Sequence, residues 1–192
     1  MYQKEKEIAI QGVIQASKLC QRVRQEIPPA LEKEDKSPVT VADFGSQAII
    51  CKALKDAFPH IPIVGEEDAT ELRQDNKQDT VNKITDYVKE IIPSATADEV
   101  LNWIDYGNGE VGNLFWTLDP IDGTKGFLRQ DQYAVALALI EDGEVKLGIL
   151  GCPALSFAEG DTGYLFLAIR GEGSYKMPIT GGEMEKIEVV SN

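Results

Sequence analysis

The chain has 192 residues, of which 43% are hydrophobic and 27% charged, and its 32 acidic residues against 19 basic ones give a formal net charge of −13. This composition is typical of one large globular domain or two small ones, and it excludes collagen-like, coiled-coil and intrinsically disordered chains. The negative charge argues against a nucleic-acid partner, because phosphates would be repelled, and it favours divalent cations.

Cysteine usage and the N-terminus bear on the compartment. The three cysteines stand far apart and the single histidine has no Cys or His cluster around it, which disfavours a zinc site and is consistent with reduced thiols, although one pair could still form a disulfide. The N-terminus lacks an apolar run of signal-peptide length, and no stretch of about 18 apolar residues follows. We therefore expect a cytoplasmic protein with no membrane partner.

Helical periodicity dominates the first half of the chain, where apolar residues recur at three- and four-residue steps. Thr96 and Glu99 have the spacing of a capping box at the start of one such pattern. The short apolar run Ile61–Val64 is typical of a strand, and the polar residues 66–80 predict a mobile loop. Helices are predicted over 7–27, 43–58, 81–91 and 96–107, the first three of them closed by prolines.

The second half is typical of strands, because its apolar runs are short, rich in β-branched and aromatic residues, and separated by glycines. Asp142-Gly143 between two of these runs predicts a type I′ hairpin. Helices first and antiparallel strands afterwards indicate an α+β fold with helices packed on a mainly antiparallel sheet. The expected strands are Leu114–Leu118, Tyr133–Ile140, Val145–Leu150, Tyr164–Ile169 and Ile187–Val190.

Residues 107–112, GNGEVG, match the glycine spacing of dinucleotide-binding loops. That fingerprint requires a strand before it and a helix after it. Here the predicted order is reversed, so no helix N-terminus follows that could hold a pyrophosphate. We expect a flexible turn at this position and no bound nucleotide.

A stronger candidate site is the hexapeptide DPIDGT at 119–124, which follows a predicted strand. Proline fixes the backbone and glycine permits a tight turn, so the carboxylates of Asp119 and Asp122 and the carbonyl of Ile121 can point into one small volume. Such hard oxygen ligands suit Mg²⁺. Alternatively, the two carboxylates only accept backbone N–H groups in a surface turn, and the hexapeptide alone leaves both readings open.

Two further segments carry acidic groups. GEED at 65–68 follows a predicted strand end, where it is either a solvated acidic loop or a cluster bridged by a cation. Residues 36–43 place an extended segment before a helix whose first turn carries Asp43, and a charge there could serve the helix N-terminus alone.

Convergence of these segments would create a catalytic centre. Glu66, Asp119 and Asp122 would then form a two-metal carboxylate site. Asp43 and Thr124 would be placed to deprotonate a metal-bound water.

Three motifs in order carry a family resemblance. SPVTVAD at 37–43, GEED at 65–68 and DPIDGTKGF at 119–127 resemble the lithium-sensitive, magnesium-dependent phosphatases of the inositol monophosphatase superfamily. Within it, the continuations at 124–129 and 132–153 are most similar to the 3′(2′),5′-bisphosphate nucleotidases. The likeness covers nearly the whole chain.

The resemblance implies a fold, a reaction and a set of site residues. It implies the N-terminal half of an αβαβα layered sandwich and removal of the 3′-phosphate of adenosine 3′,5′-bisphosphate to give AMP and phosphate. An inositol phosphate is the alternative substrate. By similarity, the Mg²⁺ ligands are Glu66, Asp119, Asp122 and the Ile121 carbonyl, Asp43 and Thr124 activate the attacking water, and the amides of Gly123 and Thr124 face the phosphate.

The resemblance also has a departure. Members of the family are longer, and their second half supplies a Trp-Asp-x-Ala-Ala-type motif that neither Trp103 nor Trp116 provides here. We therefore expect residues 1–192 to form the N-terminal metal-binding domain without a C-terminal substrate domain. Such a chain is either an enzyme module with weak or no turnover in the absence of a second domain or partner, or a non-catalytic metal-binding or interaction domain. In the second case, the apolar face left uncovered would favour self-association.

Overall fold

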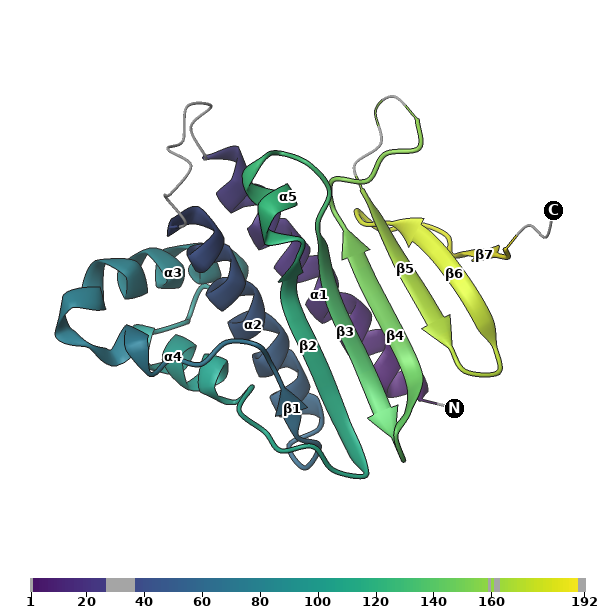
Figure 1. Ribbon diagram of the computed structural model, residues 1–192, viewed down its shortest axis with the longest axis horizontal. Coiled ribbons are helices and arrows are strands. Elements are labelled where there is room, and N and C mark those ends of the chain that lie inside the picture. The colour runs from purple at the N-terminus through teal and green to yellow at the C-terminus, as the bar shows by residue number, and fades with distance from the viewer. Residues whose placement is uncertain (1, 27–36, 159, 161–162, 190–192) are drawn as a thin grey trace.

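The computed structural model describes residues 2–26, 37–158, 160 and 163–189 (Figure 1). Two long helices, α1 (Gln3–Gln25) and α2 (Ser37–Ala57), pack along each other at the start of the chain. Helices α3 (Gln78–Ile91) and α4 (Ala97–Asp105) pack against α2. The shorter helical segments are η1 (Glu71–Arg73), η2 (Asp75–Lys77) and α5 (Thr124–Leu128).

The strands of the described region form one seven-stranded sheet in chain order, from β1 to β7. Only β1 and β2 run parallel, and every other neighbouring pair is antiparallel. The predicted α+β class with a mainly antiparallel sheet is therefore confirmed. The strands are β1 (Ile63–Val64), β2 (Leu114–Asp122), β3 (Ala134–Glu141), β4 (Glu144–Cys152), β5 (Tyr164–Ile169), β6 (Gly173–Pro178) and β7 (Glu185–Ile187).

Helices α1 and α2 lie behind the sheet and cover one of its faces (Figure 1). Successive side chains of a strand point to opposite faces, and Leu137 and Leu139 of β3 and Leu147 and Ile149 of β4 are buried on the helical side. The intervening residues of these strands face away from the helices. In the described part of the chain, that outer face has no second layer of helices.

Two local predictions are confirmed. Asp142 and Gly143 have φ angles of 52° and 76° between β3 and β4, as the central residues of a type I′ turn require. Thr96 and Glu99 form the capping box at the start of α4, where the Glu99 amide donates to the Thr96 hydroxyl and the Thr96 amide donates to the Glu99 carboxylate. Turn and cap chemistry thus fix these boundaries.

In the described residues, the cysteines form no disulfide and no helix is suited to cross a membrane. Cys20, Cys51 and Cys152 are all free thiols. None of the described helices combines the length and the apolarity that a membrane crossing requires. The first predicted helix ends within the described residues at Gln25, whereas Ile27 and the two prolines after it lie outside them.

The second helix begins earlier than predicted. Helix α2 starts at Ser37, so residues 37–42 are helical and Asp43 lies in the second turn, not in the first. A proline needs no helical hydrogen bond from its nitrogen in the first turn, so Pro38 is compatible with the helix start and does not force an extended segment. Lys36 lies outside the described residues.

The polar stretch 66–80 is only partly the loop we expected. The turns η1 and η2 and the start of α3 occupy most of residues 71–80. Leu72 is buried there, and the guanidinium of Arg73 pairs with Asp105 at 2.6 Å, so these turns are attached to α4. Contacts made over a long sequence distance order this segment, and a local polarity pattern cannot show them.

Several elements escape the sequence patterns. Neither helix α5, which begins at the last residue of the predicted turn, nor strand β6 was predicted. The last strand lies at Glu185–Ile187 instead of Ile187–Val190, and Val190 is outside the described residues. Strand β6 lacks an alternating apolar pattern because all of its residues are partly exposed.

The glycine-rich segment 107–112 is packed against β1. The Gly109 amide donates to the Ile63 carbonyl at 2.8 Å, and the Gly107 carbonyl accepts from the Gly65 amide at 2.7 Å. A helix precedes this segment and a strand follows it, which is the reverse of a dinucleotide-binding loop. The expected turn is observed at Tyr106 and Gly107, and backbone hydrogen bonds connect Gly107 and Gly109 to the segment of β1, while its flexibility stays a prediction.

We expect Gly109→Ala to destabilise the fold and Gly112→Ala to leave it nearly unchanged. A Cβ at position 109 would lie 2.6 Å from the Ile63 carbonyl oxygen, whereas one at position 112 would meet nothing within 4 Å. Overpacking of this kind costs about 1 to 3 kcal/mol. Urea unfolding of both variants measures the difference, and equal free energies of unfolding would contradict the packing described here.

Candidate metal centre

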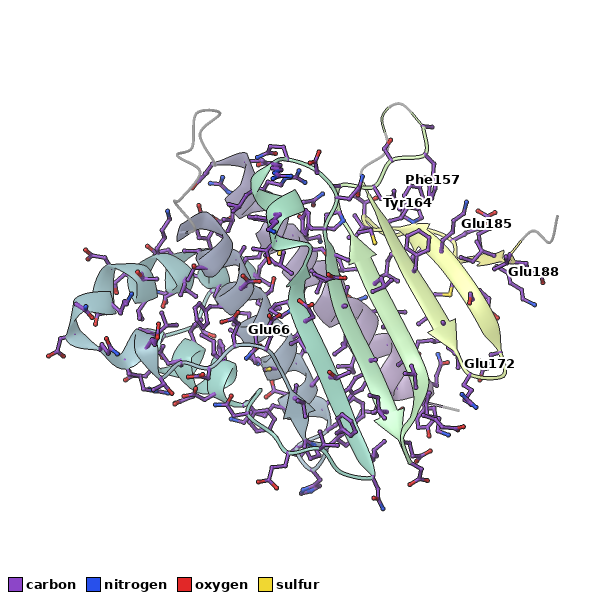
Figure 2. All side chains as sticks on the ribbon, in the orientation of Figure 1. Glu66, Phe157, Tyr164, Glu172, Glu185 and Glu188 are labelled. Carbon is purple, nitrogen blue, oxygen red and sulfur yellow. The ribbon has the colours of Figure 1, made fainter. Side chains whose placement is uncertain are left out.

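The candidate site lies at an open edge of β2. Strand β1 pairs only with Trp116 and Thr117, so no described strand pairs with that edge of β2 beyond Thr117. The chain leaves β1 at Gly65 and turns toward α4, while α2 packs beside β2. Glu66 therefore lies in the space between α2 and β2 (Figure 2).

The loop after β1 is attached to the C-terminal end of α4. The Ala69 amide donates to the Asp105 carboxylate at 2.8 Å, and Arg73 pairs with the second oxygen of that carboxylate. Asp68 accepts from the Thr70 amide at 2.8 Å and is exposed. Asp68 thus behaves as expected for a solvated acidic loop, since its carboxylate binds a nearby backbone amide. Asp105 instead positions the loop, and the sequence motifs did not indicate this role.

The hexapeptide at the end of β2 combines strand, turn and helix. Pairing with β3 is irregular between Asp119 and Asp122, and Gly123 has a φ of 92° before α5 begins at Thr124. Asp119 accepts from the Ile121 amide at 3.1 Å, and the Thr124 hydroxyl donates to the Ile121 carbonyl at 3.5 Å. The capping alternative is therefore observed for Asp119, but a carboxylate has further lone pairs for a cation.

Asp43 is the most strongly perturbed carboxyl of the site. Burial raises its pKa to about 8, and the charges of Glu67, Glu66 and Asp119 add to the increase. Desolvation and like charges both disfavour the ionised form. This shift indicates that α2, the loop after β1 and the end of β2 bring their carboxyl groups close together.

The pKa values of Asp119 and Glu67 are also raised. Burial raises the pKa of Asp119 to about 6, followed by the charge and hydrogen bond of Glu66 and the charge of Asp122. Burial also raises the pKa of Glu67, with further contributions from Glu66, Asp68 and Asp119. The Ile121 amide is the group that lowers the pKa of Asp119. Acidic side chains thus surround one another here without a basic side chain among the groups that shift them.

These residues fit a divalent cation by their donor chemistry and charge. Carboxylate oxygens are the hard ligands that Mg²⁺ prefers, and a cation would relieve the repulsion among them. Among the described residues, no group of three Asp, Glu, His or Cys side chains is placed so that it could hold a metal ion. Asp119 and Glu66 already lie within hydrogen-bonding distance of each other, so ligation by a third side chain requires rotation of a neighbouring carboxylate.

Sequence reasoning located most of this cluster. The structure brings Asp43, Glu66 and Asp119 together, with Asp122 beside Asp119. Gly123 and Thr124 lie directly after it, at an exposed position. Glu67 belongs to the same cluster and was not singled out, although its place in the GEED motif was the available signal.

Comparison with known proteins identifies the family of this chain. The chain belongs to the inositol monophosphatase family, whose family model matches residues 3–192. It is 42% identical over 207 residues to the 3′(2′),5′-bisphosphate nucleotidase of Schizosaccharomyces pombe, covering 96% of this chain and 58% of the relative. It is 46% identical over 197 residues to 3′(2′),5′-bisphosphate nucleotidase 2 of Candida albicans, covering 91% of this chain and 55% of the relative.

A solved structure supports the fold. An inositol monophosphatase from Zymomonas mobilis superimposes with a TM-score of 0.61 at 20% sequence identity, covering 100% of this chain and 55% of that one. This likeness supports the fold, and the family model over residues 3–192 confirms the expected membership of the superfamily. The chain spans little more than half the length of each of these proteins.

The raised pKa of Asp43 predicts a pH-dependent stability in the absence of metal. This carboxyl titrates at 3.8 when unperturbed and at about 8 in the fold. Between these values the folded chain keeps a proton that the unfolded chain has released, so the free energy of unfolding falls as the pH rises. Compared with Asp43→Asn, the wild-type chain should lose stability from about pH 4 to about pH 8. Urea unfolding across this window tests it, and parallel curves would contradict it.

Proposed function

We propose that this chain carries the metal-binding part of a magnesium-dependent phosphomonoesterase that removes the 3′-phosphate of adenosine 3′,5′-bisphosphate to give AMP and phosphate. The observation that carries the proposal is the uncompensated cluster of Asp43, Glu66, Glu67 and Asp119 at the open edge of β2. The names of the relatives support the nucleotide substrate.

Mg²⁺ would be held by the carboxylates of Glu66, Asp119 and Asp122 and by the main-chain carbonyl of Ile121. Bound there, it would offset the charge of the phosphate and lower the pKa of a coordinated water. The acidic cluster requires this counter-charge, because a phosphate ester carries the same sign of charge as the site itself.

The remaining residues would act on the water and the phosphate. The carboxyl of Asp43 would accept the proton of the attacking water, since a nearby cation lowers the pKa of this buried group and keeps it ionised. The Thr124 hydroxyl, which now donates to the Ile121 carbonyl, would orient that water. The backbone amides of Gly123 and Thr124, two exposed residues, would donate to the phosphate oxygens.

A Mg²⁺ titration of phosphate release from adenosine 3′,5′-bisphosphate tests the proposal. We expect release by the chain to be weak, to depend on Mg²⁺, to be inhibited by lithium and to fall at least about 100-fold in Asp119→Asn, because loss of a ligand costs no less than loss of a residue that orients one. Asp86→Asn, an exposed carboxyl on α3, is the matched control and should leave the rate unchanged. Release equal in wild type and Asp119→Asn would contradict the proposal.

Inositol 1-phosphate serves as the competing substrate in the same assay. We expect faster release from adenosine 3′,5′-bisphosphate at equal concentrations, since the relatives with the higher identities are nucleotidases. A preference for the inositol ester would replace the nucleotide with the alternative substrate while leaving the metal chemistry intact.

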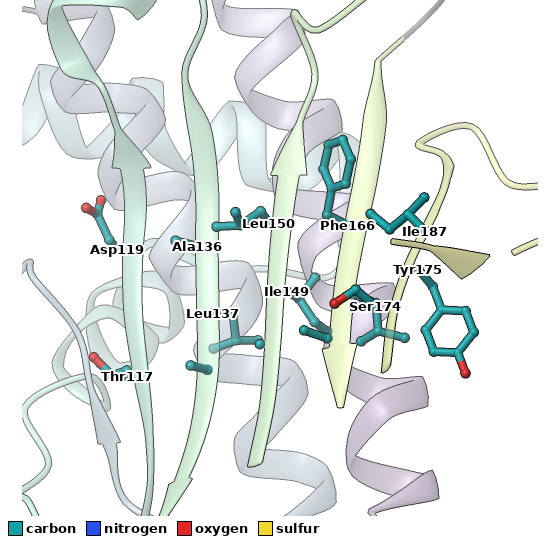
Figure 3. Close-up of a pocket in the computed structure, with 14 residues that line it drawn as sticks. Thr117, Asp119, Ala136, Leu137, Ile149, Leu150, Phe166, Ser174, Tyr175 and Ile187 are labelled. Carbon is teal, nitrogen blue, oxygen red and sulfur yellow. The ribbon is translucent and has the colours of Figure 1, made fainter. Parts of the chain in front are cut away.

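We also propose that two copies of the chain associate through the outer face of the sheet. A hollow of about 490 Å³ runs over β3, β4 and β5, with Asp119 at its rim (Figure 3). Its lining is mostly apolar, and Leu150 within it is 44% exposed. The net charge of −13 would make copies repel over most surfaces, so a face of low charge is where they could meet.

Leu150→Lys should abolish this association, because it places a charge in the hollow. Val111→Lys changes an apolar residue that is 72% exposed and does not line the hollow, so it should leave the association unchanged. Sedimentation velocity over a range of protein concentrations distinguishes the variants. A wild-type chain that stays monomeric throughout would contradict the proposed interface.

A further inference from the structure

The side chain of Gln47 joins three parts of the fold at a buried position. It lies on α2 and is 0% exposed. Its Nε2 donates to the Glu67 carbonyl at 2.5 Å and to the Ile104 carbonyl at 2.9 Å, and its Oε1 accepts from the Glu67 amide at 3.0 Å. One amide group therefore connects α2 to the loop after β1 and to the end of α4.

These contacts fix the orientation of the amide. Both N–H donors of Nε2 are used, and they point at carbonyl oxygens that cannot donate in return. A flipped amide would place Oε1 against the same two carbonyls and Nε2 against the Glu67 N–H, leaving these three main-chain groups without their partner. The Gln47 amide is thus held in one orientation, and its hydrogen bonds fix the backbone of the loop at Glu67.

The Gln47 amide occupies space that exists because two neighbouring residues are glycines without a side chain. A Cβ at Gly65 would lie 2.5 Å from the Gln47 Oε1, and a Cβ at Gly107 would lie 2.6 Å from its Nε2. Gly65 directly precedes Glu66, and its amide donates to the Gly107 carbonyl at 2.7 Å. The glycine of the GEED motif is therefore explained by the space that the Gln47 amide needs.

Gln47 also has a defined relation to Asp43. The two residues are four apart on α2, so they lie on the same face of the helix, about one turn from each other. That face meets the loop at Glu67, which contributes to the raised pKa of Asp43. The distance between Asp43 and the carboxylates of the loop thus depends on how firmly Gln47 holds Glu67.

We infer that Gln47 is the positioning residue that sets the carboxylates of Glu66 and Glu67 against Asp43 and Asp119. The inference rests on the proposed function, because Glu66 is taken there as a metal ligand. Gln47 touches neither metal nor substrate in this account. It acts through the backbone of the loop, so its loss should loosen metal binding more than it slows the chemical step.

The test replaces Gln47 by Met, which is similar in size and makes none of the three hydrogen bonds. In the 192-residue chain we expect Gln47→Met to weaken Mn²⁺ binding at least about 10-fold, the scale typical of residues that orient a ligand. At saturating Mg²⁺, kcat for phosphate release should stay within about threefold. Hydrogen exchange at the Glu67 amide should accelerate at least 10-fold, whereas exchange at Ala69, whose amide is bonded to Asp105, should change less.

Ser46→Ala is the matched control. Ser46 is the neighbouring buried polar residue of α2, and its hydroxyl lies 3.0 Å from the Cys20 thiol, away from the loop. Its loss should lower the free energy of unfolding without changing Mn²⁺ affinity. Should Gln47→Met fail to fold, Gly65→Ala disturbs the same contact from the loop side and should give the same metal and exchange results.

The outcomes separate this inference from the proposed function. Wild-type Mn²⁺ affinity in both Gln47→Met and Gly65→Ala, or unchanged exchange at Glu67, would overturn the positioning role. Equal loss of Mn²⁺ affinity in Ser46→Ala would overturn it as well, since general destabilisation would then be the cause. A wild-type chain that binds no Mn²⁺ would instead overturn the proposed function, and with it the metal-positioning role of Gln47, independently of any variant.

Discussion

Mutual repulsion among neighbouring carboxyl groups is the constraint on which the arrangement of this site depends. Asp43 and Asp119 are both partly buried and both have raised pKa values, and Glu66 and Glu67 add charge between them. Such a cluster destabilises a fold unless a cation offsets it. The chain nevertheless assembles it from three separate segments, which is the pattern expected when stability is given up for a binding site.

The surrounding structure supplies what holds these groups in place. Strand β1 is only two residues long, so the edge of β2 stays open next to the cluster. The loop after β1 is then secured from two sides, by the buried amide of Gln47 on α2 and by the carboxylate of Asp105 at the end of α4. Both anchors bind main-chain groups of the loop, so neither of them uses the carboxylates of Glu66 and Glu67.

Much of this could be predicted from local patterns. Periodicity gave the helices and the antiparallel sheet, and the hairpin at Asp142 followed from turn chemistry, because these features depend on neighbouring residues. The acidic motifs identified Glu66 and Asp119 as candidate metal ligands. The start of α2 was missed because Pro38 fits either a helix start or an extended segment, and the role of Gln47 could not be found because its partners lie 20 and 57 residues away in the chain.

The central claim is that the cluster at the edge of β2 is a divalent-cation site, and a crystal structure of the chain soaked in Mn²⁺ tests it most directly. Anomalous scattering locates the ion without assumptions about activity. The account predicts a peak about 2 Å from carboxylate oxygens of Glu66 and Asp119. Density for Mn²⁺ only at other surface carboxylates, or none at a concentration that saturates binding in solution, would contradict it.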